Sequence, residues 1–218
     1  MTYPRSSALE SSLESLGPIW TERFGMRVPL RFREIEEERK QFENLAICDL
    51  SALPKMGVKG RGAVACLREE GLTVPERIYG WRQLEDGGLA IRTDRNEVFL
   101  EEGIEGSTLA GLSKKLGRGA TSVDRVERQD TCLLLSGSRA IEVLRQTCSF
   151  NFSVESETVV MTRIALVSCM VLSCREAGVP VYRIWCIPSY GVYLWENLLQ
   201  IVAELGGDAV GVECVEMS

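Results

Sequence analysis

Two stretches of the sequence follow the same pattern, MGVKGRGAVACL at residues 56–67 and CLLLSGSRAIEVL at residues 132–144. Each begins with a short run that is typical of a strand, reaches a glycine that turns the chain, and continues with apolar residues at helical spacing. The turning glycines are Gly60 and Gly137. The two stretches therefore predict two strand–turn–helix units that occupy equivalent places in a repeat.

The segments that follow each unit extend this repeat. In both halves we expect two strands, then a helix, then a last strand. In the first half these are residues 89–92, 98–101, 107–116 and 121–126. In the second half they are residues 162–174, 181–187, 189–205 and 209–215. This is the split β-α-β order of ferredoxin-like units, so the predicted fold class is α+β with two pseudo-repeated units of this kind.

The residues before the repeat have a different pattern. Leucines at helical spacing near the start, and the charged run EIEEERKQFE at residues 34–43, indicate helices. We therefore divide the chain into an N-terminal helical segment at residues 1–44, a first α/β unit at 45–128 and a second at 129–218. Together they are expected to form one compact module.

The amino-acid composition excludes several classes of site. The 218 residues contain no histidine, so no Ser-His-Asp triad, Cys-His dyad or histidine metal site can form. Acid–base chemistry near neutral pH would need a tuned carboxylate, lysine, tyrosine or cysteine. The net charge of −6 disfavours nucleic acids and anionic membranes as partners.

The eight cysteines contain no Cys-x-x-Cys pair and mostly lie in apolar runs. We therefore expect buried, reduced thiols and no bound metal. The N-terminus lacks the apolar core of a secretory signal, and no apolar stretch approaches the length of a membrane span. These features predict a cytoplasmic protein.

Three stretches resemble the folate-binding fold of the aminomethyltransferase, or T-protein, of glycine cleavage. They are FGMRVP at residues 24–29, LAICDLS at 45–51 and VKGRGA at 58–63. The matching stretches of that family read roughly G-x-x-V-P, G-x-x-D-L-S and V-x-G-x-x-A. The resemblance implies two pseudo-repeated α/β units, in agreement with the pattern of strands and helices.

Five stretches are more specifically similar to the gamma subunit of heterotetrameric sarcosine oxidase, and this likeness covers about residues 24–210. They are DLSALP at 49–54, WRQLEDGG at 81–88, RQD at 128–130, GVPVYR at 178–183 and PSYGVYLW at 188–195. The resemblance implies a small accessory subunit. Its partners would be larger flavin- and folate-binding subunits, with FAD, FMN and NAD held by those partners.

Two carboxylates of the T-protein site have no counterpart in this sequence. The family's catalytic aspartate follows a Gly-Gly turn, but here Gly87 and Gly88 are followed by LAIR. The family's first G-E-x-G-(F/Y)-E glutamate holds the pterin; Val179 stands in its place, and Arg183 replaces the second glutamate. Leaving the pterin's adjacent donors buried and unpaired would cost about 1–3 kcal/mol. We therefore expect no catalytic residue and no cofactor bound by this chain.

The first hypothesis is accordingly a non-catalytic, gamma-type subunit of a sarcosine-oxidase-like flavoenzyme complex in one-carbon or amine metabolism. Its partner interface would come from a region dense in aromatic residues, because Tyr and Trp are enriched at interfaces. Core packing is the first interpretation of the same side chains, and an aromatic wall that stacks on a folate is a third. These residues are Tyr182, Trp185, Tyr190, Tyr193 and Trp195.

The alternative hypothesis is a free-standing tetrahydrofolate-binding protein or an aminomethyltransferase-like transferase. In that case Arg92, Arg175 or Arg183 would bind the glutamate tail of the folate, and Asp130 would substitute for a missing carboxylate. A third hypothesis, a regulatory relative that assists iron–sulfur maturation, is disfavoured because the K-G-C-Y-x-G-Q motif of those proteins is absent.

Overall fold

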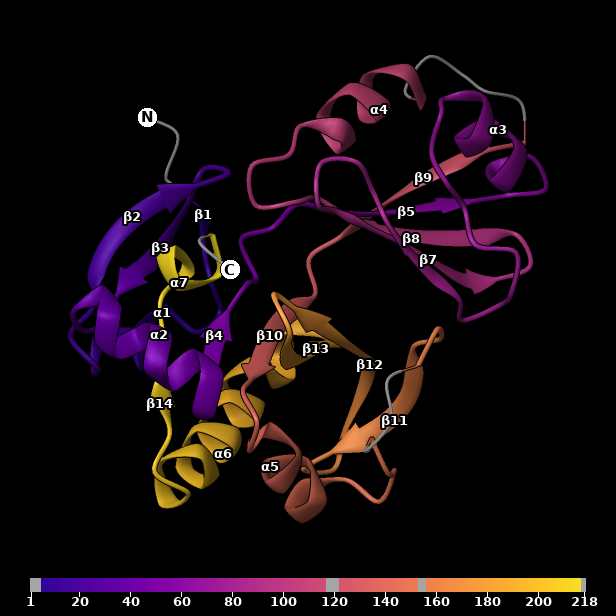
Figure 1. The fold of residues 1–218 in the computed structure, drawn as a ribbon. Helices are drawn as coiled ribbons and strands as arrows, with labels where there is room; N and C mark the ends of the chain where they lie inside the picture. Colours follow the sequence, from indigo (N-terminus) through magenta and orange to yellow (C-terminus); the bar gives the residue numbers. More distant parts are fainter. Residues whose placement is uncertain (1–4, 117–121, 153–155, 217–218) are drawn as a thin grey trace. The chain divides into compact units, whose positions relative to one another are not determined.

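The computed structural model describes residues 5–116, 122–152 and 156–216. Within it the chain forms two compact units. Unit 1 combines residues 1–52, 130–156 and 160–218, and unit 2 combines residues 53–129 and 157–159. Unit 2 is therefore an insertion in the chain of unit 1. Each unit is built on a sheet of its own (Figure 1).

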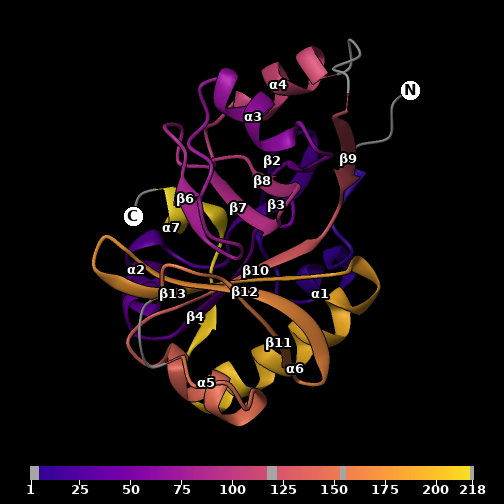
Figure 2. The ribbon, with the colours of Figure 1, turned by 90° about the vertical axis from the view of Figure 1, so that its right-hand side faces the viewer.

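Unit 2 is a five-stranded antiparallel sheet with the order β6-β7-β8-β5-β9. Its elements are β5 (Lys55–Lys59), α3 (Ala63–Glu69), β6 (Trp81–Gln83), β7 (Leu89–Asp94), β8 (Glu97–Glu101), α4 (Thr108–Leu116) and β9 (Asp124–Arg128). Both helices pack on one face of the sheet (Figure 2). β8 lies between β5 and β7, as in the predicted split β-α-β arrangement. The expected first residue of the last strand, Thr121, lies outside the described residues.

Unit 1 contains a six-stranded sheet with the order β11-β12-β13-β10-β4-β14. Its elements are β4 (Ala46–Asp49), β10 (Thr131–Ser136), α5 (Ala140–Thr147), β11 (Val160–Ile164), β12 (Val167–Glu176), β13 (Val179–Cys186), the 3-10 helix η1 (Pro188–Tyr190), α6 (Gly191–Glu204) and β14 (Asp208–Ala209). α5 and α6 cover the same face of this sheet (Figures 1 and 2). Both units therefore have the predicted α+β construction.

The strand order of unit 1 repeats that of unit 2 with one insertion. β10, β12 and β13 take the places of β5, β7 and β8, but β4 lies beside β10 where β9 lies beside β5. β14 is displaced outward and pairs in parallel with β4. The expected start of the first α/β unit at residue 45 differs from this arrangement. Residues 46–49 belong to unit 1 because they pair along residues 133–136 of β10.

One predicted strand region is a hairpin. Residues 162–174 were expected to run as a single strand region, but β11 ends at Ile164 and β12 begins at Val167. The chain reverses at Ala165 and Leu166, which both have positive φ. Non-glycine residues rarely adopt this conformation, so the sequence carries no turn signal at these positions.

The end of the repeat also departs from its prediction. Residues 209–215 were expected to form a last strand, but β14 stops at Ala209 and the chain continues into α7 (Val212–Glu216). The place beside β10 that this strand would take is filled by β4. The last segment instead buries Val212, Cys214 and Val215 on a short helix.

The N-terminal segment contains a sheet as well as the expected helices. Its three strands lie in the order β1-β3-β2, and α1 and α2 complete the segment. The bounds are β1 (Arg5–Ser6), α1 (Glu10–Glu14), β2 (Ile19–Arg23), β3 (Met26–Arg31) and α2 (Ile35–Asn44). β2 and β3 turn at Phe24 and Gly25, which both have positive φ, as two-residue hairpin turns require. Positive φ is unusual for phenylalanine, which is why the hairpin was not anticipated.

The two turning glycines of the repeat have equivalent conformations. Gly60 has φ of +120° and Gly137 has φ of +106°. A Cβ atom on Gly60 would lie 2.1 Å from the carbonyl oxygen of Ser122, and one on Gly137 would lie 2.3 Å from the backbone of Asn44. Backbone atoms cannot move aside as a flexible side chain can. Both positions therefore require glycine for two independent reasons.

All eight cysteines are free thiols. Five of them are buried, namely Cys48, Cys132, Cys169, Cys186 and Cys214. Desolvation by burial, with smaller contributions from neighbouring groups, raises the pKa of Cys169, Cys186 and Cys214 to about 12. These thiols remain protonated at neutral pH and behave as small apolar side chains.

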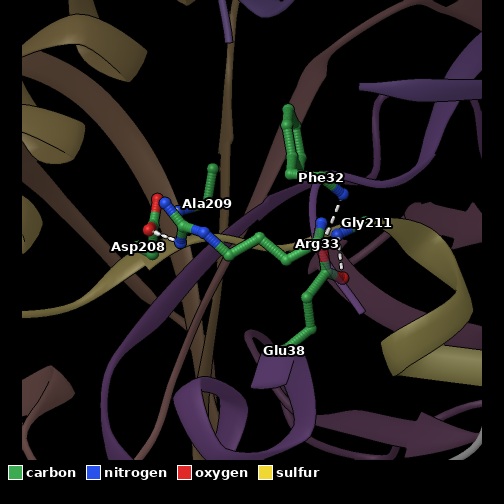
Figure 3. Close-up of polar contacts among 6 residues, drawn as sticks. All are labelled: Phe32, Arg33, Glu38, Asp208, Ala209 and Gly211. Atoms are coloured by element: carbon green, nitrogen blue, oxygen red, sulfur yellow. Dashed lines mark hydrogen bonds and ion pairs between the residues drawn. The ribbon is translucent and has the colours of Figure 1, made fainter. Parts of the chain in front are cut away.

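A buried carboxylate fastens α2 to two neighbouring loops of unit 1 (Figure 3). Oε1 of Glu38 accepts hydrogen bonds from the N–H groups of Phe32 and Arg33, and Oε2 accepts one from Gly211 at 2.9 Å. Close by, Arg33 forms an ion pair with Asp208 of β14. The side chain of Glu38 thus supplies acceptors for backbone donors that would otherwise be unpaired.

We expect Glu38→Ala to lower the free energy of unfolding by about 3 kcal/mol or more, because it leaves three backbone N–H groups without their acceptor. Urea unfolding followed by tryptophan fluorescence measures this change. Glu37→Ala is the matched control on an exposed position of the same helix, and its effect should stay within about 0.5 kcal/mol. Equal effects of the two substitutions would contradict this role of Glu38.

Gly137→Ala should destabilise the protein by about 2–4 kcal/mol, because it adds a backbone clash to an unfavourable φ. Gly178→Ala provides the comparison. Gly178 has φ of +85° and open space around its Cβ position, so only the conformational cost of about 1 kcal/mol applies there. Chemical denaturation of both variants would refute the argument if Gly178→Ala were the more damaging.

Candidate functional site

The sheet of unit 1 has a second face, opposite α5 and α6. Cys48, Leu134, Arg183 and Leu172 form one row across β4, β10, β13 and β12. Their chain neighbours belong to the core under the helices, and successive side chains of a strand alternate between faces. The row therefore places one buried guanidinium, that of Arg183, among apolar and thiol groups.

Arg183 is neutralised by a carboxylate from the adjoining hairpin. Its Nη2 lies 3.1 Å from Oε1 of Glu176, and the arginine side chain is only 8% exposed. Glu176 is the last residue of β12 and stands opposite Val179. Between them the chain turns at Ala177 and Gly178, which both have positive φ. The β12–β13 hairpin thus places an arginine–carboxylate pair on the face of the sheet opposite α5 and α6.

Glu176 is the candidate residue that sequence reasoning missed. The resemblance to T-proteins places Val179 where that family has a glutamate, and it does not extend to the strand before the turn. The sequence does carry a signal for this pairing. If Ala177 and Gly178 form a two-residue turn, the residues on either side of it, Glu176 and Val179, stand opposite each other in the hairpin. The carboxylate therefore lies across the ladder from the expected position.

The other predicted folate residues do not gather at this hairpin. Arg175 lies beside it and donates from Nη1 to the carbonyl oxygen of Gly178 at 2.8 Å. Asp130 lies just before β10, toward its opposite end, where its charge adds to the effect of burial in raising the pKa of Cys186 to about 12. Of the four, Arg175 and Arg183 lie in the same hairpin, but their side chains project from opposite faces of the sheet, because Arg183 stands opposite Leu172 and Arg175 is three residues further along β12.

Arg92 belongs to unit 2 and is engaged in its local structure. Its Nη1 donates to the carbonyl oxygens of Pro75 and Glu76 at 3.3 and 2.8 Å, and its Nη2 donates to that of Arg95 at 3.0 Å. These bonds hold the loop before β6 against the β7–β8 turn. The guanidinium of Arg92 is therefore used to stabilise backbone within its own unit.

The five aromatic candidates separate into two groups. Tyr182, Trp185 and Trp195 are buried. Tyr190 and Tyr193 are 52% and 46% exposed, at the end of η1 and the start of α6. Two exposed aliphatic side chains, Ile187 and Val192, lie in the same short segment. We call Ile187, Tyr190, Val192 and Tyr193 the α6 apolar surface.

The DLS motif at residues 49–51 forms a buried polar cluster in unit 1. Oδ2 of Asp49 accepts from the Ser7 hydroxyl at 2.8 Å, and Oδ1 accepts from the N–H and the hydroxyl of Ser51. The Ser51 oxygen accepts in turn from the N–H of Cys132. The cluster ties the N-terminal segment and the end of β4 to β10, which is a structural role.

A tuned carboxylate, one of the four kinds of group that could serve acid–base chemistry in the absence of histidine, occurs in unit 2. Burial, a hydrogen bond that the protonated Glu102 donates to Asp86, and the charge of Asp86 raise the pKa of Glu102 to about 7, although N–H groups of Leu109 and Thr108 act in the opposite direction. Glu102 follows β8, and Asp86 lies in the β6–β7 turn. The same turn precedes the position at which the T-protein aspartate was expected.

Among the described residues, no group of three or more Cys, Asp or Glu side chains is arranged to hold a metal ion. None of the helices in the described part of the chain is both long and apolar enough to cross a membrane.

No protein-family model matches this sequence. No curated protein matches it at a significant level either.

Solved structures do match its fold. The glycine cleavage system aminomethyltransferase T from Bartonella henselae superposes with a TM-score of 0.79 at 16% identity, over 97% of this chain and 61% of that one. A heterotetrameric sarcosine oxidase from Corynebacterium sp. U-96, solved in complex with pyrrole 2-carboxylate, matches with a TM-score of 0.61 at 16% identity. That match covers 79% of this chain and 93% of the other. The T-protein fold is thereby established, while this chain spans about three fifths of the aminomethyltransferase.

Proposed function

We propose that this chain is a small, non-catalytic, gamma-type subunit of a sarcosine-oxidase-like flavoenzyme complex in one-carbon or amine metabolism. It would act in the cytoplasm, and partner subunits would carry the amine-oxidising chemistry. The aminomethyltransferase and sarcosine oxidase likenesses both support the T-protein fold on which the proposal is built.

The observation that carries the proposal is the extent of the sarcosine oxidase match. Because 79% of this chain corresponds to 93% of that chain, the matched chain is shorter than this one. A small chain of a heterotetramer is a separate subunit that works together with partner chains, whereas a free-standing enzyme works alone. The aminomethyltransferase, by contrast, extends well beyond the part that this chain matches.

The chemistry of the β12–β13 hairpin supports the absence of catalysis. Val179 cannot accept the paired donors of a pterin, and the nearby carboxylate of Glu176 is occupied by Arg183. An arginine that neutralises the carboxylate weakens its ability to accept from a ligand. In this proposal the chain binds no cofactor itself, and FAD, FMN, NAD and folate belong to the larger partner subunits.

The α6 apolar surface is the proposed contact with the large subunit. Tyr190 and Tyr193 are the two predicted interface residues with exposed side chains. Tyrosine contributes a large rigid apolar area and a hydroxyl donor, a combination that is enriched at interfaces. The buried Tyr182 and Trp195 belong to the core beneath α6 and would support the surface from within unit 1, whereas Trp185 lies on the opposite face of the sheet.

This role is tested by co-expression of the tagged chain with the large flavin-binding subunits of a sarcosine-oxidase-type enzyme, followed by affinity and size-exclusion chromatography. We expect a stable complex, and we expect the double substitution of Tyr190→Glu and Tyr193→Glu to weaken it at least tenfold. Leu166→Glu, at the exposed tip of the β11–β12 hairpin, is the control and should assemble normally. A monomer that elutes apart from every flavin-binding partner would argue against an accessory role.

The second candidate function is tetrahydrofolate binding by this chain alone. The ion pair of Glu176 and Arg183 favours it, because a folate carries both kinds of group that this pair can bind. An anionic group of the ligand would pair with Arg183, and a hydrogen-bond donor of the ligand would bind the carboxylate of Glu176. Of the other predicted folate residues, Arg175 lies in the same hairpin but on the other face of β12, Asp130 lies at the far end of β10, and Arg92 belongs to unit 2.

Calorimetric titration of the isolated chain with tetrahydrofolate separates the two functions. The accessory role predicts no binding at micromolar concentrations. Binding in that range that is lost in Glu176→Gln, and kept in the exposed control Glu204→Gln, would establish the folate-binding alternative instead.

A further inference from the structure

We propose that Asp86 and Glu102 form a proton-dependent clasp, which holds the β6–β7 turn against the first turn of α4 and releases the turn when the shared proton leaves. This inference concerns unit 2 alone and is independent of the proposed accessory role. Its basis is the geometry of two carboxyl groups that meet at one helix end.

The two carboxyl groups converge on the same backbone donor. Oε1 of Glu102 accepts from the Thr108 N–H at 3.0 Å, while Oδ2 of Asp86 lies 3.4 Å from the same nitrogen. A Cβ atom on Gly106 would lie 2.7 Å from each of these two oxygens. The oxygens therefore share one small space, which is open to them because residue 106 is a glycine.

A hydrogen bond between the two carboxyl groups requires a proton. Ionised carboxylates only accept hydrogen bonds, so one partner must be the protonated acid. Burial raises the pKa of Asp86, but hydrogen bonds from Thr108, Glu102 and Gly88 outweigh it and leave the pKa below its ordinary value. The pKa of Glu102 is raised to about 7. The proton therefore resides on Glu102 and the negative charge on Asp86.

The other charged groups near the clasp are either exposed or paired with a partner of their own. Glu85 and Glu105 lie in the same two loops with exposed side chains. Glu101, the chain neighbour of Glu102, is paired with Lys55 at 3.6 Å. At the far end of α4, Lys115 is paired with Glu70, and Lys114 lies in the same last turn. The partial positive charge at the start of α4 favours one carboxylate there but is about half an elementary charge, too small to balance two.

The weaker of the two attachments should open. Glu102 holds α4 through the N–H groups of two residues, Thr108 and Leu109, at 3.0 and 2.8 Å. Asp86 reaches α4 through Thr108 alone, by a longer contact of 3.4 Å with its N–H and by a hydrogen bond from its side chain. When both groups are charged, Asp86 and its turn move away while Glu102 continues to cap the helix. The mobile segment is then residues 84–88.

The pH dependence follows from the raised pKa of Glu102. The closed form binds the proton more tightly than the open form, so the clasp is fully closed below the ordinary glutamate pKa of 4.5. The equilibrium constant for opening of the clasp rises about tenfold per pH unit between pH 4.5 and pH 7, and levels off above pH 7.

Hydrogen–deuterium exchange of the full-length protein, corrected for the intrinsic rate, tests the proposal at residues 84–88. We expect opening of this turn to increase at least about tenfold between pH 5 and pH 8, while Leu109 keeps its protection. Glu102→Gln is uncharged and can still donate to Asp86, so its turn should remain protected across this range. Glu105→Gln should behave like the wild type.

The carboxyl carbon of Glu102, followed by nuclear magnetic resonance, should titrate with a midpoint near 7. The proposal is wrong if this midpoint lies near 4.5, if exchange at the turn does not change with pH, or if Glu102→Gln opens like the wild type. Asp86→Asn, which also removes one of the two charges, provides a second variant should Glu102→Gln fail to fold.

Discussion

The close approach of two backbones at Gly60 and again at Gly137 is the constraint on which both units depend. At each place a strand ends, the chain passes within contact distance of another backbone segment, and a helix starts. The approach fixes where the helix leaves the sheet, and hence which face of the sheet it covers. Because the same turn occurs in both units, the same order of strands can follow from it twice, even though little sequence identity links the halves.

The sequence allowed this repeat to be predicted because the strand–glycine–helix pattern is local. The place of β4 could not be predicted in the same way, since its pairing with β10 joins residues more than 80 positions apart. The hairpins at Phe24-Gly25 and Ala165-Leu166 were missed because they place non-glycine residues at positive φ. Local signals therefore located the elements of the fold, whereas long-range pairing decided their neighbours.

The candidate site was less accessible from sequence than the fold. The comparison of motifs pointed to the β12–β13 hairpin, and within it compared only Val179 and Arg183 with the family's glutamates. The cross-strand position of Glu176 depends on where the turn falls, and one residue of error would move its side chain to the other face. The pairing of Asp86 with Glu102 could not be predicted for a different reason. The two residues belong to separate loops that meet only at the start of α4.

The distribution of the cysteines has a consequence for the chemistry of the folded chain. The five buried thiols are spread over four strands of one sheet, β4, β10, β12 and β13, and the helix α7, and all belong to unit 1. The ionised sulfur is the nucleophile that attacks an alkylating reagent, and burial suppresses this ionisation. The buried thiols of unit 1 can therefore report on whether the unit is folded. They resist alkylation while the unit is folded and react when it unfolds.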